Sequence, residues 1–493
     1  MAEGSEGTCI DRSQDVCETQ SLETIVERVE EALTNFQRNL DIASKDMSMI
    51  SDRSRRIQVK LKNMEAAQAK LVGEIDNSVV PPPLIRSICS GDMDAPEWLL
   101  SLDQLSTLLA AGAQNEKQGK FVEMLRDKAI ERIRNYIVAS IRAFRRALVD
   151  INGLQQGHFT SKAPFYAFCF QYNKELALEL QQAYVNTMRW CYSYHLEQYC
   201  KFLEQLHVQK GEIIKVEDDK RGFFSLTRTS ALTVQQNFSL GLRSNENLNS
   251  IITVAQLPRL NTQHIHLERV FSSLELVLTE NASSEYSFLM EYFSLSGEER
   301  TTVFNQIFEP AFSVCNHYLH DLIHASQDCL GVLICIRFTQ GLALESQKKL
   351  VPVLEPHLNS MLLMLWPRFQ AIMDLHSQSI HKTSLTIRTD DSSVRPHPLS
   401  QKVAELIHSL SSLCAQSRED EPVERSVARV VQEFVTTLTK LSNTISDQHH
   451  RARFLSNNYT LVSAVLSGAP GRLAAEQKKY FDELDTSTTN TST

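Results

Sequence analysis

Apolar residues recur at alternating spacings of four and three positions from Leu22 to Ile75. Sixteen positions follow this heptad rule, and only Ser54 and Gln68 among them are polar. Such a repeat places a narrow apolar seam along one helix and predicts a coiled coil, roughly 80 Å long at about 1.5 Å per residue. A stripe of this length cannot be buried within its own segment, so it requires partner helices. The predicted partner-binding seam comprises Leu22, Val26, Val29, Leu33, Phe36, Leu40, Met47, Ile50, Ile57, Leu61, Met64, Leu71 and Ile75.

Helical periodicity also dominates the rest of the chain, and glycine and proline are few, at 16 and 14 of 493 residues. We therefore predict an all-α protein, with an N-terminal coiled coil followed by stacked helical bundles. Three prolines at 81–83 end the first helix, and those at 352, 356 and 367 are expected to interrupt later ones. The predicted divisions are a disordered acidic tail (1–20), the coiled coil (21–78), a helical bundle (84–208), a connector (209–262), a second bundle (263–381), a loop (382–399), C-terminal helices (400–481) and a disordered tail (482–493).

Composition excludes several classes of protein. The net charge of −9 argues against nucleic-acid binding, which needs a concentrated basic face. The ten cysteines form no C-x-x-C pair, so neither a zinc ribbon nor a disulfide framework is indicated. The first residues lack an apolar signal core, and the longest nearly apolar run, 329–336, is too short to span a bilayer. We expect a cytoplasmic protein with only peripheral membrane association.

A search for catalytic or cofactor motifs finds no glycine-rich phosphate loop, nucleophile elbow or zinc-protease signature. The best metal candidate is His317, His320 and His324, close to Cys315 and Asp321. Because a straight helix rarely brings three ligands to one ion, we interpret His317 and His324 as buried or boundary residues that are hydrogen-bonded to their neighbours. The sequence therefore predicts no catalytic, cofactor-binding or metal-binding residues, no cofactor and no enzymatic activity.

A second surface candidate is a basic helix with interleaved aromatic residues. Arg132, Arg134, Arg142, Arg145 and Arg146 alternate there with aromatic and apolar residues. Such a helix could contact anionic lipid or an acidic partner. It is also typical of the solvated face of an amphipathic bundle helix, which is the interpretation we favour.

Eight sequence blocks follow one another in a characteristic order along the chain. They are LTNFQRNL (33–40), SDRSRRIQVKLKNMEAAQAKL (51–71), VVPPPLIRSI (79–88), FSLGLR (238–243), HLERVFSSLELVLTENASSEYSFLMEYF (266–293), QDCLGVLICIRF (327–338), RPH (395–397) and FLSNNYTLV (454–462). Together these blocks resemble the vacuolar protein sorting-associated fifty-two (Sac-two) family. The resemblance extends over nearly the whole chain, although the chain is shorter than many relatives.

The resemblance implies a subunit of the multisubunit tethers GARP and EARP, with a helical-rod tether fold. The implied function is capture of endosome-derived vesicles in retrograde transport to the trans-Golgi network, and endosomal recycling. Implied partners are three other tether subunits bound through coiled-coil helices, endosomal syntaxin-type SNAREs and a Rab- or Arf-like GTPase, on trans-Golgi and endosomal membranes. The residues themselves leave two alternatives open: a subunit of another helical-rod tether, such as exocyst or a Golgi tether, and a membrane or cytoskeletal coiled-coil scaffold.

Overall fold

The computed structural model describes residues 11–78, 80–111, 116–146, 150–214, 238, 240, 243, 248–256, 265–386, 394–415 and 421–490. Nearly all of them are helical, and the extended pairing in these ranges is one isolated bridge between Val208 and Ile265. The prediction of an all-α fold is confirmed. The chain divides into two compact units, Met1–Ala129 and Ile130–Thr493, so the boundary falls inside the predicted 84–208 bundle.

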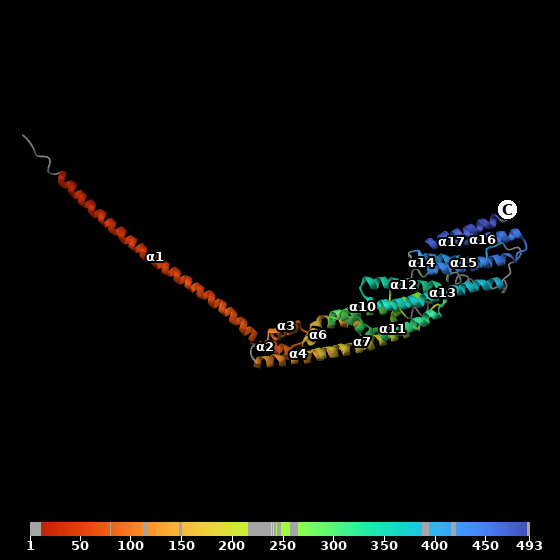
Figure 1. The fold of residues 1–493 in the computed structure, drawn as a ribbon, viewed down its shortest axis with the longest axis horizontal. Helices are drawn as coiled ribbons and strands as arrows, with labels where there is room; N and C mark the ends of the chain where they lie inside the picture. Colours follow the sequence, from red (N-terminus) through yellow and green to blue (C-terminus); the bar gives the residue numbers. More distant parts are fainter. Residues whose placement is uncertain are drawn as a thin grey trace, which may run out of the picture. The chain divides into compact units, whose positions relative to one another are not determined.

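The first unit begins with one long helix, α1 (Asp11–Ser78), shown in Figure 1. Pro81 then caps α2 (Pro82–Ser90), where the missing N–H of Pro82 costs nothing because the first amides of a helix have no intrahelical partner. Leu84 and Ile88 of α2 are buried, as are Trp98 and Leu102 of α3 (Pro96–Ala111), which packs against α2. The helix α4 (Glu116–Ala143) crosses the boundary between the units.

The second unit is a succession of antiparallel and crossing helices, in which neighbours in the chain usually pack together (Figure 1). The closest pairs are α7 with α11, α12 with α13, α13 with α15, and α16 with α17. Its helices are α5 (Ile151–Leu154), α6 (Ala163–Tyr172), α7 (Lys174–Leu203), α10 (Leu267–Phe293), α11 (Gly297–Ala325), α12 (Cys329–Lys348), α13 (Glu355–Thr386), α14 (Pro398–Cys414), α15 (Glu421–Ser442), α16 (Gln448–Leu466) and α17 (Arg472–Asn490), with short helical turns η1 (Gln155–Phe159), η2 (Thr160–Lys162), η4 (Val254–Gln256) and η5 (Pro352–Leu354).

The apolar run at 329–336 belongs to α12, which is longer than the run itself. Among the described helices, α12 is the one long and apolar enough to cross a membrane by length and composition. However, 56% of its most apolar window is buried within the fold. Since α12 packs against α10, α13 and α14, its hydrophobicity is that of a core helix.

Both predicted terminal tails are wrong where the structure describes them. The helix α1 already begins at Asp11, and residues 1–10 lie outside the described residues. No glycine or proline occurs between 11 and 20, so the helix continues into this polar segment. At the other end α17 continues to Asn490, because Asp485 accepts a hydrogen bond from Thr460 (3.1 Å) on α16 and holds this polar turn in place.

Two further expectations concern α13 and the connector. Pro367 does not interrupt α13 but lies inside it, because burial of the flanking Leu365 and Phe369 outweighs the cost of about 3 kcal/mol for an internal proline. The same helix extends to Thr386, so it includes the start of the predicted 382–399 loop. Most of the predicted 209–262 connector lies outside the described residues.

The core at one end of the second unit contains a buried carboxylate surrounded by aromatic rings. Glu285 of α10 accepts hydrogen bonds from the hydroxyls of Tyr184 (2.9 Å) and Tyr192 (2.9 Å) and from the Gln155 side-chain amide (2.6 Å). All four side chains are buried, and Phe288 stacks on Tyr184 at 5.3 Å. Burial raises the pKa of Glu285 to about 7, against the lowering effect of these three hydrogen bonds.

This carboxylate predicts a specific pH dependence of stability. The folded protein keeps the Glu285 proton up to about pH 7, whereas the ordinary pKa is 4.5. The free energy of unfolding should therefore fall as pH rises between these values and level off above them. We expect Glu285→Gln to remove this slope, measured as the guanidinium midpoint at about pH 5 and about pH 8. Glu291→Gln, an exposed change on the same helix, is the control; equal slopes in both variants would contradict the prediction.

Candidate assembly interface

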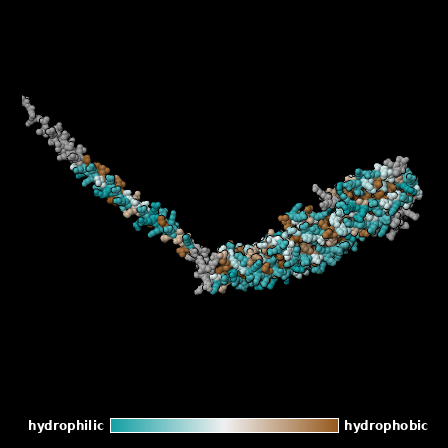
Figure 2. Space-filling view, in the orientation of Figure 1, coloured by the Kyte–Doolittle hydropathy of each residue, from teal (hydrophilic) through white to brown (hydrophobic). Residues whose placement is uncertain are grey.

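The predicted seam lies on α1 and is uncovered along the part that the structure describes. Side chains are described from Thr24 to Val72, and every one of them is exposed. The eleven predicted seam residues within this range are between 51% (Val29) and 73% (Met47) exposed. Leu22 and Ile75 lie outside the described side chains. Figure 2 shows the resulting apolar patches along α1, among hydrophilic side chains.

Charge is distributed unevenly along the same helix. Glu27, Glu30 and Glu31 make its first part acidic, whereas Arg53, Arg55, Arg56, Lys60 and Lys62 make its middle part basic. Arg53 and Lys60 each precede a seam position, Ser54 and Leu61, and therefore flank the seam. In coiled coils such flanking charges select the partner and its register.

The histidines considered as metal ligands do not form a common site. His317 is 83% exposed and lies 3.7 Å from Asp321, which also contacts His320 at 3.1 Å. The hydrogen bond to His320 is the main cause that lowers the pKa of Asp321. Cys315 is buried and therefore separated from these exposed groups. The sequence interpretation of His317 and His324 as buried or boundary residues is wrong, because both side chains lie on the solvent side of α11.

A different group of titratable residues does converge in the interior. His266, Glu268 and Asp328 place ligand atoms within 4.8 Å of one another. The Arg243 guanidinium already supplies a cation there, with Nη1 2.7 Å from Asp328 Oδ2 and 3.4 Å from Glu268 Oε1. Burial and the nearby Arg243 charge lower the pKa of His266. This cluster is a buried ion network rather than a vacant metal site.

The network joins three distant parts of the chain. Arg243, Glu268 and Asp328 come from the blocks 238–243, 266–293 and 327–338, which carry the family resemblance. Asp328 also caps α12, since its Oδ1 accepts a hydrogen bond from the Gly331 amide at 3.1 Å. The sequence analysis does not identify this cluster. Arg243 is the one charged residue of its block, but the other two blocks contain several charged residues, so the sequence does not indicate which of them pair.

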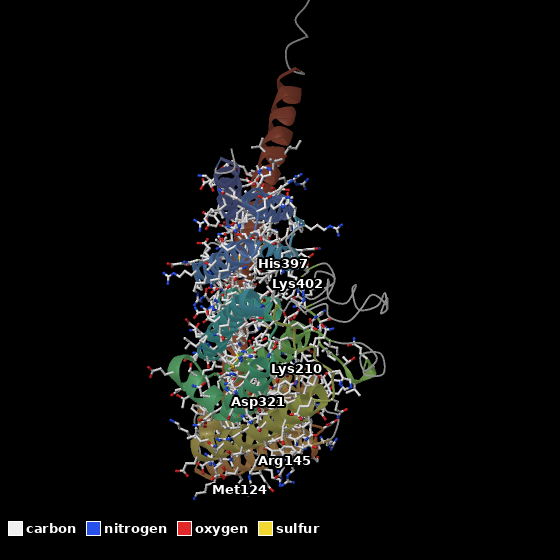
Figure 3. All side chains as sticks on the ribbon, turned by 90° about the vertical axis from the view of Figure 1, so that its right-hand side faces the viewer. Met124, Arg145, Lys210, Asp321, His397 and Lys402 are labelled. Atoms are coloured by element: carbon white, nitrogen blue, oxygen red, sulfur yellow. The ribbon has the colours of Figure 1, made fainter. Side chains whose placement is uncertain are left out.

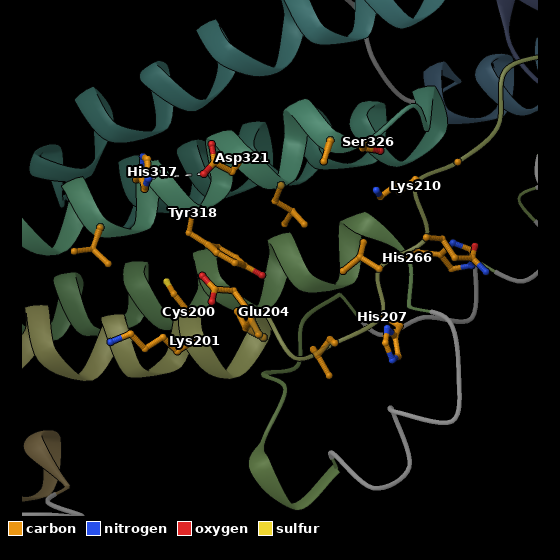
Figure 4. Close-up of a pocket in the computed structure, with 18 of the residues that line it drawn as sticks. Cys200, Lys201, Glu204, His207, Lys210, His266, His317, Tyr318, Asp321 and Ser326 are labelled. Carbon is orange, nitrogen blue, oxygen red and sulfur yellow. Dashed lines mark ion pairs between the residues drawn. The ribbon is translucent and has the colours of Figure 1, made fainter.

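A groove with a volume of about 1320 Å³ lies between the end of α7, the segment 204–212 and α11 (Figure 4). Its charged side chains include Lys201, Glu204, Lys210 and Asp321, so both signs are present. Lys201 is already paired with Glu197 at 2.7 Å. Mixed charges of this kind select no single class of ligand.

Comparison with known proteins supports the resemblance found in the sequence. The family models "Vps52/Sac2 family, coiled-coil" and "Vps52, C-terminal" match residues 10–169 and 186–492. Vacuolar protein sorting-associated protein 52 of Schizosaccharomyces pombe is 46% identical and is aligned over 97% of both chains. The Homo sapiens homologue is 26% identical over 90% of this chain but only 63% of its own length.

A search of solved structures finds helical exocyst subunits. The structure of Exo70p with the Exo84p C-terminal domains aligns with a TM-score of 0.48 and 10% identity, over 86% of this chain and 77% of that chain. The helices and the exposed heptad segment define an all-α protein with an N-terminal coiled-coil region. The chain belongs to the Vps52/Sac2 family.

Proposed function

We propose that this chain is a non-enzymatic subunit of a GARP/EARP-like vesicle-tethering complex. It would act in retrograde transport from endosomes to the trans-Golgi network and in endosomal recycling. The observation that carries the proposal is the exposed seam of α1, in a chain whose family is named for vacuolar protein sorting. The proposed partners are three other tether subunits, endosomal syntaxin-type SNAREs and a Rab- or Arf-like GTPase, with the complex peripheral on trans-Golgi and endosomal membranes.

The driving force for assembly is burial of the seam. Apolar surface contributes about 25 cal/mol per Å² when it is removed from water. Leu33, Phe36 and Leu40 are each more than half exposed in this chain, so that contribution is available only on contact with other helices. Assembly through α1 requires no catalytic group, which agrees with the prediction of a non-enzymatic role.

The proposal is tested by identifying what the full chain binds. We expect affinity purification of the tagged chain from its own cell, followed by mass spectrometry, to recover three other subunits of a GARP- or EARP-type tether at comparable amounts. Recovery of exocyst subunits instead would favour the other helical-rod tether. Recovery of only a second copy of this chain would favour a homodimeric scaffold and contradict the proposal.

A further inference from the structure

Two large aromatic side chains of α7 remain at the surface of the second unit. Trp190 is 46% exposed and Tyr194 is 44% exposed. Their rings stack at 5.1 Å with an interplanar angle of 11°, so each holds the other in a fixed orientation. Trp and Tyr combine an apolar ring with a polar tip, and such side chains are enriched where one end is apolar and the other hydrated.

One arginine lies against this aromatic pair, and three more are close to these residues in the chain. The Arg145 guanidinium is 6.0 Å from the Trp190 ring centre, and Figure 3 labels Arg145 at the surface. Arg142 and Arg146 are its close neighbours in the chain, and Arg189 directly precedes Trp190. All four are exposed. We call the set Arg142, Arg145, Arg146, Arg189, Trp190 and Tyr194 the aromatic-arginine patch.

Several other exposed arginines of the same unit are paired with carboxylates. Arg425 pairs with Glu421, Arg429 lies 2.7 Å from Asp374, and Arg472 pairs with Glu424. None of the four patch arginines forms an ion pair with a residue that the structure describes. Their positive charge is therefore uncompensated within the described fold.

The face of α7 next to the aromatic pair carries no net negative charge. Asn186 and Tyr194, one turn to either side of Trp190, are uncharged. Glu197 lies one turn beyond Tyr194 on the same face, but Lys201 pairs with it at 2.7 Å. Because this acidic side chain is offset by Lys201, the aromatic pair and the arginines can approach an anionic layer without a net repulsion from this part of α7.

We propose that the aromatic-arginine patch docks directly on an anionic phospholipid surface. Arginines near such a surface are attracted to the phosphate and carboxylate head groups, by roughly fivefold in binding per residue. Trp and Tyr rings insert at the level of the head groups, where their polar tips stay hydrated. The groove between α7 and α11 includes no patch residue, and Trp190 and Tyr194 are nearly half exposed, which suits contact with an extended surface.

The test is co-flotation of the purified full chain with two kinds of vesicle. We expect binding to vesicles containing phosphatidylserine and at least about tenfold weaker binding to pure phosphatidylcholine vesicles. Arg145→Glu with Arg189→Glu should weaken binding to the anionic vesicles about tenfold or more, and so should raising the salt concentration. Trp190→Ala with Tyr194→Ala should weaken it about tenfold as well, with the salt dependence kept.

Matched variants separate this surface from general effects of charge or hydrophobicity. Arg395→Glu with Arg453→Glu makes the same charge change at exposed sites elsewhere, and Leu344→Ala with Leu363→Ala removes two exposed apolar side chains. We expect both controls to bind like the unaltered chain. Equal binding to both vesicles, no binding, or equal losses in patch and control variants would overturn the proposal.

One further outcome would assign the patch to a protein. If Trp190→Ala with Tyr194→Ala left vesicle binding intact but removed a co-purifying subunit, the patch would be a protein interface and the lipid proposal would be wrong. The patch lies on α7, the last turn of α4 and the residues that follow α4, whereas the proposed assembly seam lies on α1. Failure of vesicle binding therefore leaves the assembly proposal standing, and failure of assembly leaves the lipid proposal testable.

Discussion

Replacing Leu33, Leu40 and Leu61 together with Asp is expected to abolish co-purification of the partner subunits. All three leucines occupy the seam, and each is more than half exposed in this chain. Losing a leucine from a packed interface costs about 2–5 kcal/mol, and a buried carboxylate adds a desolvation cost. Since 1.4 kcal/mol is tenfold in affinity, the three changes should weaken assembly more than about a thousandfold. Quantitative mass spectrometry of the purified complex measures this loss.

The same helix offers a matched control. Ile42, Met49 and Val59 are also more than half exposed, but they lie off the heptad seam. Changing these three to Asp alters the charge of α1 by the same amount and removes three exposed apolar side chains, but leaves the seam intact. We expect the complex to be retained at near its normal level in this control. Equal loss in both triple variants, or normal partner recovery after the seam change, would remove the support for assembly through the seam.

The largest effect on stability is expected from Arg243→Ala. This change would leave Glu268 and Asp328 as neighbouring buried carboxylates without the cation that lies 3.4 Å and 2.7 Å from them. Removing one partner of a buried ion network typically costs about 3–5 kcal/mol. The midpoint of thermal or guanidinium unfolding of the full chain should drop accordingly. Arg453→Ala, at an exposed position of α16, should leave the midpoint nearly unchanged.

The variant Arg243→Lys is expected to have an intermediate stability. It keeps one positive charge but replaces the planar guanidinium with a compact ammonium group. We expect a smaller loss than for Arg243→Ala, because one carboxylate can still be paired. If Arg243→Ala and Arg243→Lys unfolded at the same midpoint as the control Arg453→Ala, the buried network would contribute nothing to stability.

The sequence predicts the elements that depend on local periodicity. The seam residues from Val26 to Leu71 share one apolar stripe, and the structure places them on a continuous helix because heptad spacing is a property of neighbouring turns. The all-α fold follows in the same way. The ends of the helices are less predictable from the sequence. Pro367 locally favours the end of a helix, but α13 continues through it because α13 packs between α12 and α15.

Features that join distant parts of the chain are not predictable from local pattern. Gln155 and Glu285 are 130 positions apart, and their hydrogen bond exists only because η1 and α10 pack together. Arg145 belongs to a helix that the sequence interprets as an ordinary solvated face, but the fold brings it over Trp190. Likewise, His317 and His324 are prominent in the sequence, although the converging carboxylates lie elsewhere, at Glu268 and Asp328.

The uncovered state of α1 also bears on how a cell would control the amount of this protein. A chain made in excess of its partners would display the row from Val26 to Leu71 to chaperones, whose clients are recognised by exposed apolar segments. We expect the surplus to be degraded, so that its steady-state level follows the supply of the scarcest partner. Stoichiometry would then be set by protein turnover rather than by matched synthesis.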